Sequence, residues 1–328
     1  MMPPPGFPCH AVSVRTRPLR RFGLLALAGL LVSAAPGRAI AQDKGTLDPK
    51  PLPPLAHPDD PKTPAKELFG RETAPTKSRQ ARVLGYYANG CLAGGVALPI
   101  DGDTWQVMRL SRNRNWGHPN LIRFLERLAA KAHKSAGWPG LLIGDMSQPR
   151  GGPMLTGHAS HQVGLDADIW LTPMPSHVLT RAEREEMSAT NVVAADRRDV
   201  DPHVWTPAHA ALIKTAAEDP EVERIFVNAA IKKALCRSAG DDRGWLDKVR
   251  PYWGHDYHFH VRLRCPPDSA TCKHQDPVPA GDGCGKALDW WFSEGVLHPP
   301  PPKVPPKPKP ALTLAKMPPA CRQLLHAP

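Results

Sequence analysis

The chain has 328 residues, of which 40 are proline and 26 are glycine, and only 6% are aromatic. Average proline use is about 5%, so this content is high and predicts irregular flanks. Hydrophobic residues still supply 41%, which is enough for one core of roughly 200 to 230 residues. The sequence shows neither a heptad pattern nor glycine at every third position, which excludes coiled coils and collagen.

The first 41 residues have the pattern of an export signal. Arginines precede an apolar run at 22–35, and Ala39-Ile40-Ala41 is a small-x-small cleavage site. We expect cleavage after Ala41 and no stable membrane span afterwards, because the run is short for a span; an uncleaved anchor is the alternative. The segment holds five arginines and no acid, so cleavage lowers the net charge from +11 to +6. A moderately basic protein suits an anionic polymer such as cell wall or nucleic acid.

Three zones follow the signal. Residues 42–80 are rich in proline, lysine and aspartate and are predicted to be a flexible lead-in. Residues 81–297 carry the periodic patterns and form the predicted domain. Residues 298–328 begin with a Pro/Lys tract of polyproline type and end in a short tail.

Within the domain, helices and strands are interspersed. In chain order, the patterns predict a helix at 118–134, a strand at 140–144, a helix opened by a capping box at 180–183, a helix at 206–218, a strand at 224–228 and a helix at 229–236. Strands and helices do not alternate regularly around a glycine-rich phosphate loop. The pattern therefore favours an α+β fold, a single loop-rich, disulfide-stapled domain whose central antiparallel sheet is flanked by helices.

Six cysteines remain after the signal: Cys91, Cys236, Cys265, Cys272, Cys284 and Cys321. An even number in an exported protein predicts three disulfides. No pair has CxxC spacing, so a thiolate zinc site is not expected. Six cysteines allow 15 connectivities, and spacing alone favours only the short loop between Cys265 and Cys272.

Two segments concentrate the chemistry. The first, 157–169, holds two histidines three residues apart and two aspartates two apart. The second, 253–264, alternates strictly from position 257, with an apolar face and a polar face. The polar face presents His258, His260, Arg262 and Arg264. The two arginines are interpreted as solvated at the end of the strand, with binding of peptide carboxylates as the alternative.

Neighbouring imidazoles repel when both are cationic, and a metal ion or a shared proton removes the repulsion. His161, Asp168 and His260 supply two imidazoles and a carboxylate, which matches a zinc site with one open position. His258 would lie beside the bound water without ligating. Ordinary hydrogen-bonded histidines are the alternative interpretation, but five histidines in two short segments favour a metal.

GHASHQVGLDADIW and WGHDYHFHVRLRCP resemble the two signature segments of penicillin-insensitive murein endopeptidases. That family belongs to a wider group of zinc peptidases with D-Ala-D-Ala dipeptidases and hedgehog-type domains. The resemblance extends to RIFVNAAIKKALC, NWGHPNLI, LLIGDM and PPDSATCKHQDPVPAGDGCG and covers roughly residues 82–325.

The resemblance implies roles for individual residues. His161, Asp168 and His260 match the positions that hold the catalytic zinc, and His158 matches a further metal-binding position. A family Asp-x-x-His pair falls at Asp196 and Asp199, where aspartate replaces histidine, so a second metal stays open beside a solvated charge cluster. The implied disulfides join Cys91 to Cys321, Cys236 to Cys284, and Cys265 to Cys272.

The implied activity is zinc-dependent hydrolysis of D-alanyl–meso-diaminopimelate cross-links in periplasmic peptidoglycan, with no role for nucleic acid. Zinc lowers the pKa of its bound water to about 7. His258 is the candidate base and His255 a second catalytic partner, while Asp166 and Asp256 are expected to be supporting residues. No Ser-x-x-Lys occurs, so the serine route of penicillin-binding enzymes is absent. A D,D-carboxypeptidase or dipeptidase, and a non-catalytic metal-containing wall-binding module, are the alternatives.

Overall fold

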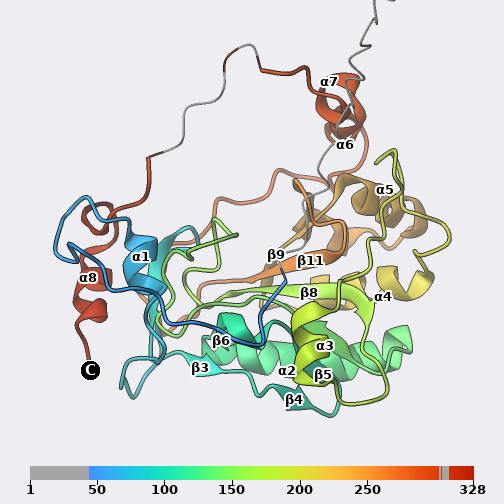
Figure 1. Ribbon diagram of the computed structural model, residues 1–328. Helices are drawn as coiled ribbons and strands as arrows, with labels where there is room; N and C mark the ends of the chain where they lie inside the picture. The colour runs from blue at the N-terminus through green and yellow to red at the C-terminus, as the bar shows by residue number, and fades with distance from the viewer. Residues whose placement is uncertain (1–43, 303, 305–309) are drawn as a thin grey trace, which may run out of the picture. The chain divides into compact units, whose positions relative to one another are not determined.

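A seven-stranded sheet, in the order β10-β9-β11-β8-β7-β5-β4, lies at the centre of the protein (Figure 1). The structure is a computed structural model that describes residues 44–302, 304 and 310–328. The expected signal segment and part of the Pro/Lys tract lie outside the described residues. The strands are β4 (Asp101–Gly102), β5 (Trp105–Val107), β7 (Leu141–Ile143), β8 (Asp166–Pro173), β9 (Val222–Val227), β10 (Val249–Pro251) and β11 (His258–Leu263).

The middle of this sheet is antiparallel, because β11 pairs antiparallel with both β8 and β9, and β8 with β7. The pairs β5–β7 and β9–β10 are parallel. A parallel pair needs a crossover connection, and a helix lies in sequence between the two strands of each pair. The predicted α+β class is confirmed, with a sheet that is mixed rather than purely antiparallel. Two smaller sheets pair β1 (Arg82–Tyr86) with β2 (Asn89–Ala93) and β3 (Val96–Ala97) with β6 (Trp116–Gly117).

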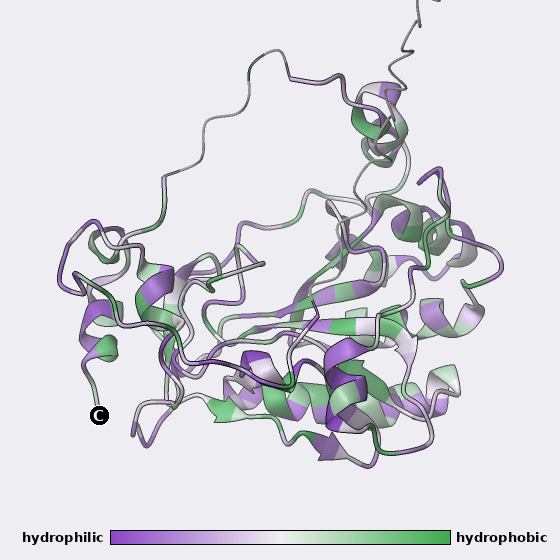
Figure 2. Ribbon diagram, viewed as in Figure 1, coloured by the Kyte–Doolittle hydropathy of each residue, from purple (hydrophilic) through white to green (hydrophobic). Residues whose placement is uncertain are grey.

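The longer helices lie where the sequence predicts them. They are α2 (Pro119–Ala136), α3 (Arg181–Glu186), α4 (Pro207–Ala217) and α5 (Ala229–Ser238). The His118 side chain caps α2 by accepting from the Asn120 amide, and Gly137 ends it in the left-handed region. The predicted capping box between Thr180 and Glu183 is present in α3. Hydrophilic and hydrophobic residues alternate around these helices, as Figure 2 shows.

One hydrophobic core joins the sheet to the helices. It includes the apolar face of α2, with Leu121, Phe124, Leu125 and Leu128 all buried, and the alternate residues Phe259, Val261 and Leu263 of β11. The apolar face predicted for β11 is therefore a core face. The same alternation turns His258, His260 and Arg262 to the opposite side of the sheet.

Residues 44–80 have more structure than the sequence predicts. The short helix α1 (Ala65–Phe69) buries Ala65 and Phe69 completely. Both belong to a second hydrophobic cluster with Cys321 and Leu324 of α8 (Pro319–Leu325). The Ala65 amide also donates to the Leu312 carbonyl. Proline and lysine dominate the composition here, so the single buried turn of helix left no periodic signal.

Three disulfides join Cys91 to Cys321, Cys236 to Cys284, and Cys265 to Cys272, which confirms the implied pairing. The first connects β2 to the tail over 230 positions of sequence. Two further short helices, α6 (Lys286–Asp289) and α7 (Glu294–Leu297), follow the Cys284 bridge. Within the residues that the structure describes, every helix is too short or too polar to cross a lipid bilayer.

Candidate metal centre

The polar faces of β8 and β11 meet at the middle of the sheet. In the antiparallel register, His260 lies opposite Asp168 and Arg262 lies opposite Asp166. Residues opposite each other on antiparallel strands project to the same face, so this register places both carboxylates beside the imidazole and the guanidinium. All four residues are buried. The strand alternation in the sequence is therefore what assembles the site.

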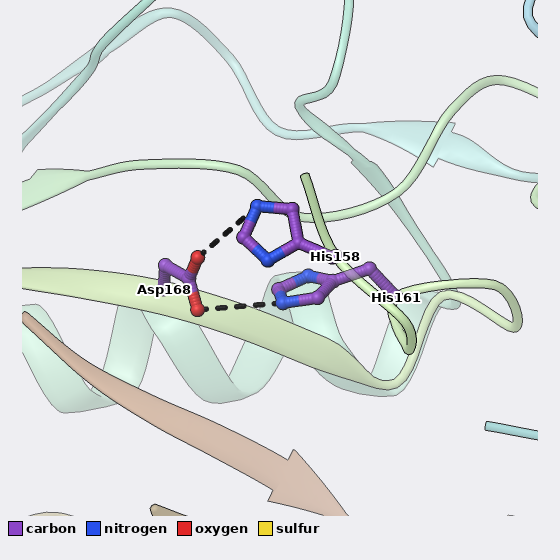
Figure 3. Close-up of side chains that lie close together, drawn as sticks. All are labelled: His158, His161 and Asp168. Carbon is purple, nitrogen blue, oxygen red and sulfur yellow. Dashed lines mark ion pairs between the residues drawn. The ribbon is translucent and has the colours of Figure 1, made fainter. Parts of the chain in front are cut away.

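His161 comes from the loop before β8, as Figure 3 shows. Its φ of 66° is in the left-handed region, which is uncommon outside glycine. Two contacts hold it there: its amide donates to Asp166 Oδ2 at 3.1 Å, and its Nδ1 lies 2.6 Å from the Met146 carbonyl. A carbonyl only accepts, so Nδ1 carries the proton. The lone pair on Nε2 consequently faces Asp168.

Three ligand atoms converge on one point. His161 Nε2 lies 3.3 Å from Asp168 Oδ1, His260 Nδ1 lies 3.4 Å from the same oxygen, and the two nitrogens are 3.1 Å apart. Zinc bonds of 2.0–2.1 Å in a tetrahedron require ligand atoms about 3.3–3.4 Å apart. The observed triangle matches this spacing without rearrangement.

The negative charge of Asp168 also favours a cation in the cluster. Asp168 Oδ1 is buried and accepts no hydrogen bond from any described residue. Burial would raise the pKa of Asp168, but the imidazoles of His258 and His161 hold it well below its usual range. The carboxylate is therefore an anion that faces two imidazole nitrogens. Such a group is stable in the interior only when a proton or a metal ion compensates it.

Asp166 organises the cluster from behind. Its Oδ1 accepts from His260 Nε2 at 2.8 Å and from Arg262 Nε at 2.7 Å. The bond fixes the proton of His260 on Nε2 and leaves Nδ1 free to ligate, which is the usual arrangement behind a metal-binding imidazole. The supporting role expected for Asp166 agrees with this geometry.

The sequence was interpreted as placing Arg262 in solvent at the end of the strand, and the structure contradicts this. The residue is only 5% exposed. Its guanidinium pairs with Asp166 and lies over the rings of Tyr87, at 4.2 Å, and Phe226, at 5.1 Å. At Arg262, strand β11 is paired with β8 on one side and with β9 on the other, so the residue lies inside the sheet. Arg264 is exposed, as expected.

His158 lies at the edge of the cluster. Its Nε2 is 3.6 Å from Asp168 Oδ2 and 3.1 Å from Asp145 Oδ2 (Figure 3 shows the first contact). His158, His161 and Asp168 form a group whose ligand atoms lie within 4.8 Å of one another. Asp145 also pairs with Arg112 and Arg114, at 2.9 and 2.8 Å. His158 Nε2 is thus shared between two carboxylates, whereas His161 Nε2 and His260 Nδ1 both lie against Asp168 Oδ1.

Sequence reasoning did not identify Asp145. This buried carboxylate follows β7 directly, in the segment LLIGDM, and its main-chain carbonyl accepts from the Asp168 amide. The available signal was an aspartate placed just after a buried strand. The arginines that pair with it come from a separate segment 31 to 33 positions earlier, so the sequence alone did not connect them.

His258 and His255 lie beside the cluster but differ in burial and in the partner of Nδ1. His258 Nε2 is 3.6 Å from Asp168 Oδ1, and burial lowers its pKa to about 3. Its Nδ1 is buried without a partner among the described residues. His255 is partly exposed, and its Nδ1 lies 2.8 Å from the Trp253 carbonyl. The imidazole rings of the two residues are 4.8 Å apart.

Asp196 and Asp199 are engaged elsewhere. Asp199 forms ion pairs with Arg237 and Lys233 of α5, at 2.7 and 3.5 Å. Asp196 Oδ1 accepts from the Arg198 amide in a turn. Neither residue is among the described groups of three or more ligands that could hold a metal ion. The arrangement agrees with the charge-cluster alternative for this pair. The Asp256 carbonyl accepts from the Val192 amide at 2.9 Å.

Fold and site together define a disulfide-bonded α+β protein with a buried cluster of imidazoles and a carboxylate that could hold a metal ion. The family model for penicillin-insensitive murein endopeptidase matches residues 83–326. The chain belongs to this family. A penicillin-insensitive murein endopeptidase of Haemophilus influenzae is 48% identical over 260 residues, which are 77% of this chain and 86% of the relative. Relatives of that name from Yersinia enterocolitica and Klebsiella pneumoniae are 47% identical over 245 residues, covering 74–75% of this chain and 85–86% of theirs.

Proposed function

We propose that the protein is a periplasmic, zinc-dependent endopeptidase that hydrolyses the D-alanyl–meso-diaminopimelate cross-links of peptidoglycan. The observation that carries the proposal is the triangle of His161 Nε2, Asp168 Oδ1 and His260 Nδ1, whose edges of 3.1–3.4 Å suit tetrahedral zinc. Membership of the murein endopeptidase family supports the reaction class. The three disulfides support an oxidising compartment.

His161, Asp168 and His260 would hold the zinc ion. Bound there, zinc supplies Lewis acidity that polarises a peptide carbonyl and acidifies water. Two imidazoles and one carboxylate leave a fourth position open, as in catalytic rather than structural sites. Asp166 and the Met146 carbonyl keep the ligand nitrogens deprotonated by holding the proton on the opposite nitrogen of each ring.

His258 is the proposed general base. Its Nε2 lies 3.6 Å from Asp168 Oδ1, beside the proposed zinc, where it would accept a proton from the attacking water. The water oxygen then bonds to the peptide carbon, the carbon–nitrogen bond breaks, and the proton passes to the leaving amine. His255, the second catalytic candidate, would stabilise the charge that develops there.

Chelation and a defined substrate test the proposal. Cross-linked muropeptide dimers should be converted to monomers by the mature protein, and a chelator should abolish the conversion. Zinc should restore it. His161→Ala and Asp168→Ala should be inactive although folded, whereas the exposed His203→Ala should behave as wild type. Full activity of metal-free protein would disprove the metal assignment, and release of a terminal D-alanine from monomers instead would favour the carboxypeptidase alternative.

A further inference from the structure

Four aromatic side chains form a surface beside the candidate metal centre. We call Tyr252, Trp253, Trp290 and Trp291 the aromatic surface. Tyr252, Trp253 and Trp290 are 51%, 50% and 55% exposed. Ring centroids of Trp253 and Trp291 are 4.9 Å apart, and those of Trp290 and Trp291 are 5.3 Å apart. Large aromatic rings contribute most when they are covered, so a group of them left in water indicates an interaction site.

The surface adjoins the catalytic histidines. The Tyr252 ring lies 5.6 Å from the ring of His255, which in turn lies 4.8 Å from His258. Trp253 is two residues from His255, and its carbonyl receives the His255 Nδ1–H. A polymer chain that leaves the candidate site on this side would therefore meet aromatic rings immediately.

The loop that carries Tyr252 and Trp253 is held in one conformation. The Asn228 amide donates to the His255 carbonyl at 3.0 Å, and its side chain donates to the Gly254 carbonyl at 3.0 Å. Gly254 and His255 both have positive φ, 68° and 55°, which turns the chain sharply between Trp253 and the site. Asn228 also caps α5. The backbone of the loop is thus attached to a helix end.

Trp290 and Trp291 are anchored to the same helix by other contacts. They lie between α6 and α7, which follow one another near α5 in Figure 1. The Cys236–Cys284 disulfide ties the start of this segment to α5, and Lys232 of α5 donates to the Asp282 carbonyl. Leu288 of α6 and Leu297 of α7 are buried. Both halves of the aromatic surface therefore rest on α5.

We propose that the aromatic surface binds the sugar rings of the peptidoglycan glycan strand; this rests on the proposed function. The C–H face of a pyranose ring is apolar and flat, and it stacks on an aromatic face while its hydroxyl groups remain in water. Murein peptides hang from the glycan as stems of a few residues, and each residue spans at most about 3.3–3.6 Å. A cross-link held at His258 thus keeps its glycan roughly 10–15 Å away. The aromatic rings begin within this reach, because the His255 ring lies 4.8 Å from the His258 ring and the Tyr252 ring lies 5.6 Å from the His255 ring.

The surroundings favour a sugar over a membrane or a second protein copy. Charged side chains border the rings: Arg198 pairs with Glu294, and Lys233 lies 5.1 Å from the Phe292 ring centroid. Lys286 and Asp289 are exposed on the same short segment. A small group of aromatic faces with a polar border can cover a sugar ring and satisfy its hydroxyl groups, whereas a lipid surface or a stable dimer needs a larger continuous apolar area.

Trp290→Ala tests the proposal, because Trp290 is the ring farthest along the surface from the catalytic residues. An amidase digest of purified sacculi provides two probes, glycan strands without peptides and cross-linked peptide dimers without glycan. We expect wild type to co-sediment with the stripped glycan and Trp290→Ala to bind it about threefold to tenfold more weakly, as for loss of one aromatic stack. KM for sacculi should rise by the same factor, and hydrolysis of the glycan-free dimer should not change.

Two variants control the test. Trp290→Phe keeps an aromatic face and should restore most of the binding. Val178→Ser removes an apolar side chain that is 69% exposed, more than Trp290, and should have no effect. Equal loss on sacculi and on the glycan-free dimer would overturn the inference, as would unchanged glycan binding, including the case where Trp290→Ala only dissociates a dimer. If wild type fails to cleave the dimer, the proposed function fails, and the glycan-binding measurement still stands alone.

Discussion

His258 and His260 share one face of one strand but have different surroundings. His260 donates its Nε2 proton to Asp166. Its Nδ1 lone pair therefore faces His161 Nε2 and Asp168 Oδ1. His258 has no such partner on Nδ1 among the described residues. Metal-binding imidazoles nearly always have their second nitrogen hydrogen-bonded. The difference supports the proposed ligation by His260 and the proposed proton transfer by His258.

This assignment predicts different losses on substitution. His260→Ala should lose both zinc and activity. His258→Ala should retain near-normal zinc, while its kcat falls by about 10²- to 10⁴-fold, the usual contribution of a general base. The fall should appear in kcat more than in KM, because the interaction forms mainly in the transition state. Elemental analysis beside turnover checks both; a zinc-free His258→Ala would make it a fourth protein ligand and favour the wall-binding module.

Asp166 is a positioning residue, and its substitution should act through His260. Asp166→Asn keeps the shape but weakens the acceptor for His260 Nε2 and Arg262 Nε. Zinc affinity should fall about 10- to 100-fold. Competition with a fluorescent chelator measures the affinity directly. Asp256→Asn is the matched control and should bind zinc like wild type; an equal loss in both variants would argue for a general effect of removing charge.

At the scale of elements, the sequence predicted most of the helices and strands that local residue patterns determine. The amphipathic pattern of α2, the capping box of α3 and the alternation of β11 identified those elements to within a few residues. Pairing partners are not local, and the strand order and parallel edges of the sheet could not be derived. The same limit explains the site: spacing indicated His161, Asp168 and His260, but Asp145 and the burial of Arg262 depend on segments brought together by folding.

The α5 helix carries a buried titratable group with a consequence for stability. Lys232 is fully buried, its Nζ donates to the Leu246 and Asp282 carbonyls, and burial, aided by the Arg250 cation, lowers its pKa to about 7. In the unfolded chain its pKa is about 10.4. Between these values the unfolded state binds more protons, so the free energy of unfolding should rise with pH, by at most about 1.4 kcal/mol per unit.

Lys232→Met should remove this dependence. Urea unfolding at several pH values between 7 and 9.5 gives the free energy of unfolding for both proteins. The wild-type curve should rise relative to the variant across that window, and the two should run parallel below pH 6, where Lys232 is protonated in both states. Lys233→Met, on the exposed side of the helix, is the control. Parallel curves throughout would show that the buried amine keeps its charge.

At the scale of the whole molecule, residues 44–80 and residues 310–328 contact each other. The Lys77 amide donates to the Pro328 carbonyl, and Arg150 pairs with Glu72 while its guanidinium donates to the Leu324 carbonyl. Residues 44–80 and 310–328 therefore stabilise each other and the neighbouring sheet of β1 and β2. Within this arrangement the Cys91–Cys321 disulfide is the covalent connection.

The length of the loop that each disulfide closes predicts how much its removal should cost. The Cys91–Cys321 bridge spans 230 positions and the Cys265–Cys272 bridge spans 7. Chain entropy gives about 5 kcal/mol for the first and about 2 kcal/mol for the second. Paired Cys→Ser variants, compared by urea unfolding, should show this order. Thiol titration of denatured, unreduced, mature wild type should find no free thiol.

Without its bridge the tail should also leave α1. Phe69→Ala is normally costly, because the ring is fully buried. The same substitution should therefore cost less in the Cys91/Cys321 variant than in wild type. Additive effects in this double-mutant cycle would mean that the tail stays docked through its hydrophobic contacts alone.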